Sequence, residues 1–154
     1  MSKVLPKISI VVPTFNEEKN IGICLRSIYQ QNYPRNKLEV FVIDDYSTDE
    51  TVRIARKFPV KIMYSGKHHG EVSKMIGFKK STGKYFMYFD ADVEIGGRDF
   101  FQKMILPLEF DTSIVASFTN EGARSSDPAL ERFLSFDTLQ RDSLYQFFSS
   151  SVES

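Results

Sequence analysis

The sequence predicts an α/β fold, with a mainly parallel sheet that carries helices on both faces. Short runs of β-branched and aromatic residues alternate with segments whose apolar residues recur at helical spacing. This alternation is typical of parallel strands joined by right-handed helical crossovers. The first two runs are apolar almost throughout, as expected for strands that are covered on both faces.

The strands are expected at residues 7–13, 38–43, 60–64, 85–89 and 114–118. The helices between them are expected at residues 17–31, 49–58, 70–81 and 98–108. Ser47 or Thr48 is expected to cap the second helix, and Gly83 is expected to end the third. Cys24 falls among the apolar residues of the first helix and is expected to be a small core residue.

Composition excludes several classes of protein. The 154 residues fit one domain, and lysines plus arginines equal aspartates plus glutamates at 20 each, which argues against a nucleic-acid-binding protein. A single cysteine excludes an intrachain disulfide and a Cys-rich zinc site. No apolar run reaches signal-peptide or membrane-spanning length, so a cytoplasmic protein is expected.

Polar motifs follow three of the predicted strands directly. They are the loop at residues 13–17, the Asp44-Asp45 pair and the tripeptide Asp90-Ala91-Asp92. Ligands of parallel α/β sheets bind beyond the carboxyl ends of the strands, so the three motifs are expected to meet at one edge. Their coincidence predicts a ligand site more strongly than any one of them.

Asp90 and Asp92 predict a site for a divalent cation. Residues two apart can point the same way, and Mg²⁺ and Mn²⁺ prefer oxygen ligands, often carboxylates completed by substrate phosphates. The competing interpretation is that one aspartate caps the helix near Arg98 while the other is solvated.

The other two motifs suit a nucleoside. A carboxylate of the Asp44-Asp45 pair could accept the N3–H of uracil. One of the two is expected instead to cap or stabilise the turn that leads into residues 47–49. Phe15 could stack on a base, or it could be a core residue.

Positive charge is expected near the third strand, at Lys67, His68, His69 and Lys74. With the start of the following helix, these side chains would favour a diphosphate. Metal binding by the two adjacent histidines is the weaker interpretation.

These motifs together resemble family-2 glycosyltransferases of the GT-A fold, a Rossmann-like nucleotide-diphospho-sugar transferase fold. The resemblance rests on Ile8 to Glu18, on Val42 to Asp49, and on Gly77, Ser81 to Tyr85 and Phe89 to Asp92. It covers residues 7–118 as a donor-binding domain. Residues 119–154 would be a loop and an amphipathic helix that begin a truncated acceptor region.

The resemblance implies a UDP-type sugar donor, a divalent metal (Mn²⁺ or Mg²⁺) and inverting transfer to an acceptor. Asp45 would read uracil, Asp90 would lie near the ribose and sugar, and Asp92 would be the main metal ligand. Lys74 stands where the family usually has Arg, and Met75 where it usually has Asn, which leaves the sugar identity open. The donor would be bound by Pro13, Thr14, Phe15, Glu17, Asp45, Lys74 and Asp90.

No general base is assigned. Relatives usually carry one on a later helix, whereas the acidic residues between 119 and 148 are typical of a loop, a helix cap and an exposed helix face. Two functions therefore remain open, an active transferase and a nucleotide-sugar-binding module without transfer activity. A receiver-like phosphoacceptor domain fits poorly, because the first strand ends in Pro13 rather than in an acidic pair.

The acceptor is unknown, with lipid-linked and polysaccharide acceptors both open. Residues 127–148 predict a helix rich in phenylalanine, with Asp127 as its cap and Pro128 at its first position. That helix is expected to pack on the sheet. The alternative is peripheral association with a membrane or self-association with another chain.

Overall fold

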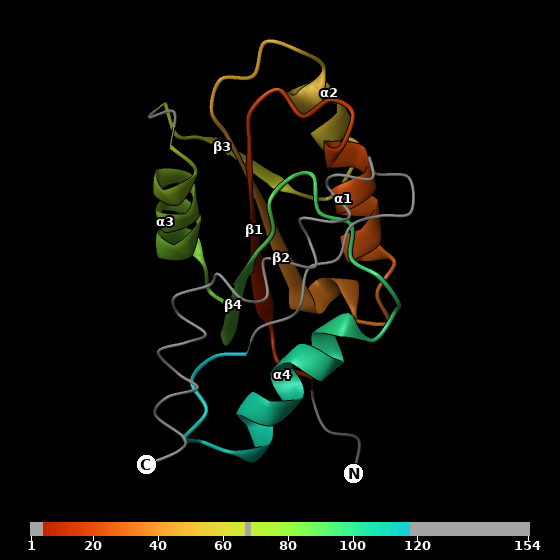
Figure 1. The fold of residues 1–154 in the computed structure, drawn as a ribbon, viewed down its shortest axis with the longest axis vertical. Helices are drawn as coiled ribbons and strands as arrows, with labels where there is room; N and C mark the ends of the chain where they lie inside the picture. The colour runs from red at the N-terminus through yellow and green to blue at the C-terminus, as the bar shows by residue number, and fades with distance from the viewer. Residues whose placement is uncertain (1–4, 67–68, 118–154) are drawn as a thin grey trace, which may run out of the picture. The chain divides into compact units, whose positions relative to one another are not determined.

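A computed structural model describes residues 5–66 and 69–117 of the chain (Figure 1). Residues up to Ile114 form one compact unit. Its sheet holds four parallel strands in the order β3 (Lys61–Tyr64), β2 (Leu38–Asp44), β1 (Ile8–Thr14) and β4 (Tyr85–Tyr88). The predicted parallel α/β architecture is confirmed.

Successive side chains of a strand point to opposite faces of the sheet, and both faces are covered. Ile10 and Val12 of β1 belong to the larger core, together with α1 (Ile21–Tyr29) and α4 (Phe100–Phe110). Val11 faces the other way, into a smaller core under α3 (Gly70–Lys80). Figure 1 shows α3 across the sheet from α1 and α2 (Thr51–Ala55). Both faces of the central strands are therefore covered, as their apolar runs predict.

Two glycines allow the chain to come close to β1. A Cβ atom on Gly77 of α3 would lie 2.3 Å from Val11 Cγ2, and one on Gly83 would lie 2.6 Å from the Ser9 backbone N. The prediction that Gly83 ends the helix is wrong, because α3 ends at Lys80 and Ser81 is already extended. Gly83 is required instead by the close approach of its loop to β1.

Two predicted helices are shorter because tertiary hydrogen bonds hold their first residues in turns. The Glu17 N–H donates to Thr51 Oγ1 and the Glu18 N–H to Asp49 Oδ2, so α1 begins at Ile21 rather than at residue 17. The capping prediction for α2 is also wrong. Its N-cap is Glu50, and Ser47 donates to Asp44 instead.

The predicted strand at 114–118 is absent over residues 114–117, which have no regular structure. Val115 is 87% exposed, so its β-branched side chain gains no packing that would favour a strand. Phe118 and the predicted helix at 127–148 lie outside the described residues. Within the described part of the chain, no helix is long and apolar enough to cross a membrane.

Candidate functional site

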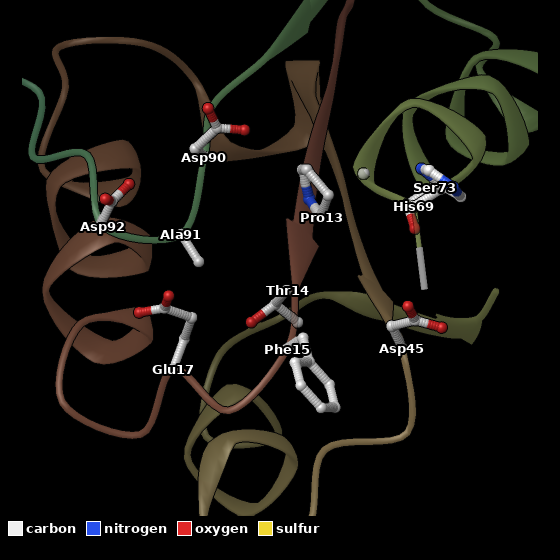
Figure 2. Close-up of a pocket in the computed structure, with 11 residues that line it drawn as sticks. Pro13, Thr14, Phe15, Glu17, Asp45, His69, Ser73, Asp90, Ala91 and Asp92 are labelled. Carbon is white, nitrogen blue, oxygen red and sulfur yellow. The ribbon is translucent and has the colours of Figure 1, made fainter. Parts of the chain in front are cut away.

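The loops after the strands converge on a pocket of about 540 Å³ at the carboxyl edge of the sheet (Figure 2). In Figure 2, Pro13 and Thr14 lie in the middle, with an aspartate-rich side on the left and a side formed by Asp45, His69 and Ser73 on the right. The pocket is lined by Pro13, Thr14, Phe15, Glu17, Asp45, His69, Gly70, Ser73, Asp90, Ala91 and Asp92. The predicted meeting of the three motifs is confirmed.

The topology explains why the pocket lies there. β1 pairs with β2 on one side and with β4 on the other, so the loops that follow β2 and β4 flank the end of β1. The crossover from β3 through α3 to β4 brings the start of α3 to the same edge. A ligand in the pocket would thus span the point where the strand order reverses.

Thr14 presents a buried hydroxyl without a partner to this pocket. The residue is only 6% exposed, and its Oγ1 has no hydrogen-bond partner among the residues that the structure describes. A buried, unsatisfied hydroxyl costs about 1–3 kcal/mol. A ligand that supplied a partner for this hydroxyl at the end of β1 would remove that cost.

Phe15 follows Thr14 and is 48% exposed at the rim of the pocket, so it is not a core residue. Asn16 has a left-handed backbone with φ of 53°, and its Oδ1 accepts the Thr48 N–H at 2.8 Å. This turn directs the chain away from the sheet after Phe15. The Phe15 ring remains accessible to a planar ligand.

The two aspartates after β2 have different surroundings. Asp44 is fully buried and accepts the Ser47 N–H at 3.0 Å and its hydroxyl at 2.6 Å, so Asp44 is the one that stabilises the turn. Asp45 lines the pocket, and its Oδ1 accepts the Ser65 hydroxyl at 2.8 Å. Its backbone N–H donates to Thr14 O at 2.9 Å and thereby joins the two loops.

Asp90, Ala91 and Asp92 form a turn directly after β4. The Val93 N–H donates to Asp90 O at 3.0 Å, and Ala91 is buried at 4% exposure. Both aspartates line the pocket, and neither is the N-cap of α4, which is Asp99. The helix-capping alternative for this tripeptide is therefore not realised.

The donor set of this turn fits a hard divalent cation. Two carboxylates face the pocket, and carboxylates combined with phosphate oxygens suit Mg²⁺ or Mn²⁺. No group of three or more His, Cys, Asp or Glu that could hold a metal occurs among residues 5–66 and 69–117. Asp90 and Asp92 would be the residues of this turn that hold such a cation.

Lys74 does not line the pocket, although sequence reasoning places it at the donor. Its Nζ lies 3.0 Å from Glu71 Oε1, 3.8 Å from Asp90 Oδ1 and 4.3 Å from the centroid of the Tyr88 ring. Partial burial opposes the charged form, but the hydrogen bond with Glu71 and the nearby Asp90 carboxylate raise the pKa of Lys74. The ammonium group therefore lies beside Asp90, and Lys74 is not one of the residues that line the pocket.

The start of α3 adds residues that sequence reasoning partly missed. His69 is the N-cap residue of α3 and lines the pocket, whereas Lys67 and His68 lie outside the described residues. Ser73 also lines the pocket and is 2% exposed. No motif marks Ser73, and its position one turn into a helix that starts at the sheet edge is the signal that could have found it.

The family model described as "Glycosyl transferase family 2" matches residues 9–148. The chain belongs to this family. The glycosyltransferase AglE of Haloferax volcanii is 34% identical over 98 residues, which are 60% of this chain and 32% of that relative. Poly(ribitol-phosphate) beta-N-acetylglucosaminyltransferase TarS of Staphylococcus aureus is 34% identical over 92 residues, 56% of this chain and 16% of the relative.

Solved structures of glycosyltransferases share the fold. Staphylococcus aureus TarS 1–349 in complex with UDP-GlcNAc has a TM-score of 0.56 and 30% identity, covering 63% of this chain and 29% of that one. Mannosyltransferase PcManGT of Pyrobaculum calidifontis, in complex with GDP-Man and Mn²⁺, has a TM-score of 0.57 and 32% identity, covering 63% and 30%. The chain thus spans a third or less of the relatives and neighbours named here, and the GT-A fold implied by the resemblance is confirmed.

Proposed function

We propose that the pocket binds a UDP-type nucleotide sugar with a divalent cation, Mn²⁺ or Mg²⁺, and that the chain serves inverting transfer of the sugar to an acceptor. The observation that carries this proposal is the two-sided pocket at the end of β1. Asp45 and Phe15 offer a carboxylate and an aromatic face for a base, and Asp90 and Asp92 offer carboxylates on the opposite side.

On the base side, Asp45 accepts the N3–H of uracil and the accessible Phe15 ring stacks on the base. Thr14 gains a hydrogen-bond partner from the nucleoside, which removes the cost of its unpaired hydroxyl. The start of α3 at Gly70 adds backbone N–H groups that favour the negatively charged part of the donor.

On the aspartate-rich side, Asp92 is the main ligand of the cation, and Asp90 lies near the ribose and sugar. Glu17 lines the same side of the pocket. When bound, the cation neutralises the diphosphate and stabilises it as a leaving group. The named neighbours support the nucleotide and the metal, because one was solved with UDP-GlcNAc and the other with GDP-Man and Mn²⁺.

The acceptor side of the reaction has no assigned residue. The chain spans only part of its relatives, so the second candidate is a module that binds the donor without transferring the sugar. We propose a polysaccharide or lipid-linked acceptor, since the Staphylococcus relative is named for poly(ribitol phosphate) and a Methanococcus voltae relative for a dolichyl phosphate sugar. Incubation with the donor distinguishes the two candidates. A transferase forms free sugar or a glycosylated product from the donor, and a binding module forms neither.

Calorimetric titration of UDP tests the donor site. We expect binding in Mn²⁺ or Mg²⁺ that weakens in EDTA, and we expect Asp92→Ala to lower the affinity in metal by roughly tenfold or more, to the level in EDTA. Asp111→Ala is the matched control, because Asp111 is exposed and lies outside the pocket lining. Equal affinity of the two variants would contradict the metal site, and no binding by the unmodified chain would contradict the donor site.

A further inference from the structure

A hydrogen bond that no sequence motif indicates fixes Asp45 from the end of β3. Ser65 follows β3 directly, and its hydroxyl donates to Asp45 Oδ1 at 2.8 Å. The Ser65 backbone N–H donates to Asp44 O at 3.1 Å and so continues the pairing of β2 with β3. Ser65 is therefore fixed by its backbone, and it orients the pocket carboxylate through its side chain.

The turn that carries Asp45 is held against β3 by a second contact. The Tyr46 ring stacks on the Tyr64 ring, with centroids 5.4 Å apart and planes 20° apart. Tyr46 has a φ of 61°, and such a conformation in a bulky residue persists where the surrounding structure fixes it. A Cβ atom on Gly66 would lie 3.0 Å from Tyr46 Cε2, so the glycine leaves room for this ring.

This arrangement affects which base the carboxylate can bind. Uracil presents one N–H, at N3 between two carbonyl groups, whereas guanine presents the adjacent N1–H and N2–H groups, which match both oxygens of a carboxylate. In this pocket, Oδ1 of Asp45 already accepts the Ser65 hydroxyl. A base that uses both oxygens has to share Oδ1 with the Ser65 hydroxyl, and a base with one N–H does not need Oδ1.

We propose that Ser65 is a positioning residue that orients Asp45 for a single N–H and thereby favours uracil over guanine. The inference rests on the proposed function, because it assigns base selectivity to the Asp45 side of the donor pocket. Proteins of this fold bind nucleotides with either base, because one named neighbour was solved with UDP-GlcNAc and the other with GDP-Man.

The test compares UDP and GDP binding in Mn²⁺ by calorimetry for the unmodified chain and three variants. Ser65→Ala should weaken UDP binding roughly fivefold to tenfold, as expected for loss of a hydrogen bond to a charged group, and should leave GDP binding unchanged or tighter. Ser65→Thr keeps the hydroxyl and should retain the preference for UDP. Ser113→Ala is the matched control, because Ser113 is exposed, its hydroxyl donates to Asp111 Oδ1, and neither residue lines the pocket.

Three outcomes would overturn the inference. Unchanged UDP affinity in Ser65→Ala would show that the hydroxyl does not act on Asp45. An equal loss for UDP and GDP, with a lowered melting temperature, would show a structural role without selectivity. A preference of the unmodified chain for GDP would contradict uracil selection while leaving a nucleotide site intact, whereas binding of neither nucleotide would contradict the proposed function itself.

Discussion

The Lys74 ammonium group lies 3.8 Å from Asp90 Oδ1 and 4.3 Å from the centroid of the Tyr88 ring. Lys74 thus reaches the pocket through Asp90 rather than by lining it. Its side chain is 19% exposed, so these contacts are partly screened from water. The ion pair and the contact with the ring together hold the Asp90 carboxylate beside the end of β4.

Replacement of Lys74 should therefore weaken UDP binding moderately. Lys74→Met removes the charge beside Asp90 but keeps much of the side-chain volume, and we expect a loss of roughly threefold to tenfold in affinity in Mn²⁺. Calorimetry gives the measurement. Lys103→Met is the control, because Lys103 pairs with Asp99, which is not a pocket residue. A loss above a hundredfold would indicate direct contact with the diphosphate instead.

Thr14→Val should affect the stability of the ligand-free protein and its affinity for UDP in different ways. The variant removes a buried hydroxyl without a partner, so the free energy of unfolding of the ligand-free protein should stay equal or rise by about 1 kcal/mol, while UDP affinity falls. Urea unfolding and calorimetry measure the two effects.

Thr51→Val provides the contrast to Thr14→Val. The Thr51 hydroxyl accepts the Glu17 N–H at 2.7 Å and donates to Asp49, so its loss should destabilise the fold by about 1–2 kcal/mol. Destabilisation by Thr14→Val to the same extent would show that the Thr14 hydroxyl has a structural partner.

Gly77→Ala should destabilise the protein despite the better helix propensity of alanine. The added Cβ would lie 2.3 Å from Val11 Cγ2, and moving α3 off β1 should cost about 1–3 kcal/mol in the free energy of unfolding. Gly96→Ala is the matched control, since a Cβ there meets nothing within 4 Å. Urea unfolding of both variants is the measurement, and equal midpoints would contradict the close packing of α3.

Glu39 should make stability depend on pH at the other end of the sheet. Its carboxylate accepts hydrogen bonds from Ser9 at 2.7 Å, from the Thr82 N–H at 2.9 Å and from Lys61 at 2.9 Å. Burial by itself would raise the pKa of Glu39, but these bonds and a contact with Lys7 outweigh it and lower the pKa well below its usual range.

A lowered pKa means that the stabilising contribution of Glu39 is fully present above the ordinary glutamate pKa of about 4.3 and is lost as the pH falls toward the folded-state value. Glu39→Gln should therefore be less stable than the unmodified chain at pH 7, by about 2 kcal/mol. The difference should shrink as the pH is lowered below about 4. Urea unfolding across this range tests the expectation, and a constant difference would contradict it.

Much of the fold could be predicted from local pattern. Strands such as β1 and β2 were recognisable because both of their faces are apolar, and the polar motifs that follow β1, β2 and β4 pointed to one edge of a parallel sheet. The predicted strand at 114–118 failed because β propensity depends on a neighbouring strand and on packing. The start of α1 at Ile21 was missed because the hydrogen-bond partners of Glu17 and Glu18 lie more than thirty residues away in the chain.

The sequence by itself determined the parallel α/β architecture, the family and the convergence of Asp45, Asp90 and Asp92, because periodicity and order along the chain encode them. Only the tertiary structure decided that the Thr14 hydroxyl is buried without a partner in the described part of the chain. It also decided that Lys74 lies beside Asp90 and that the Ser65 hydroxyl donates to Asp45. These relationships depend on side-chain contacts between segments distant in sequence, which become determined only when the strands are in register and the helices are packed.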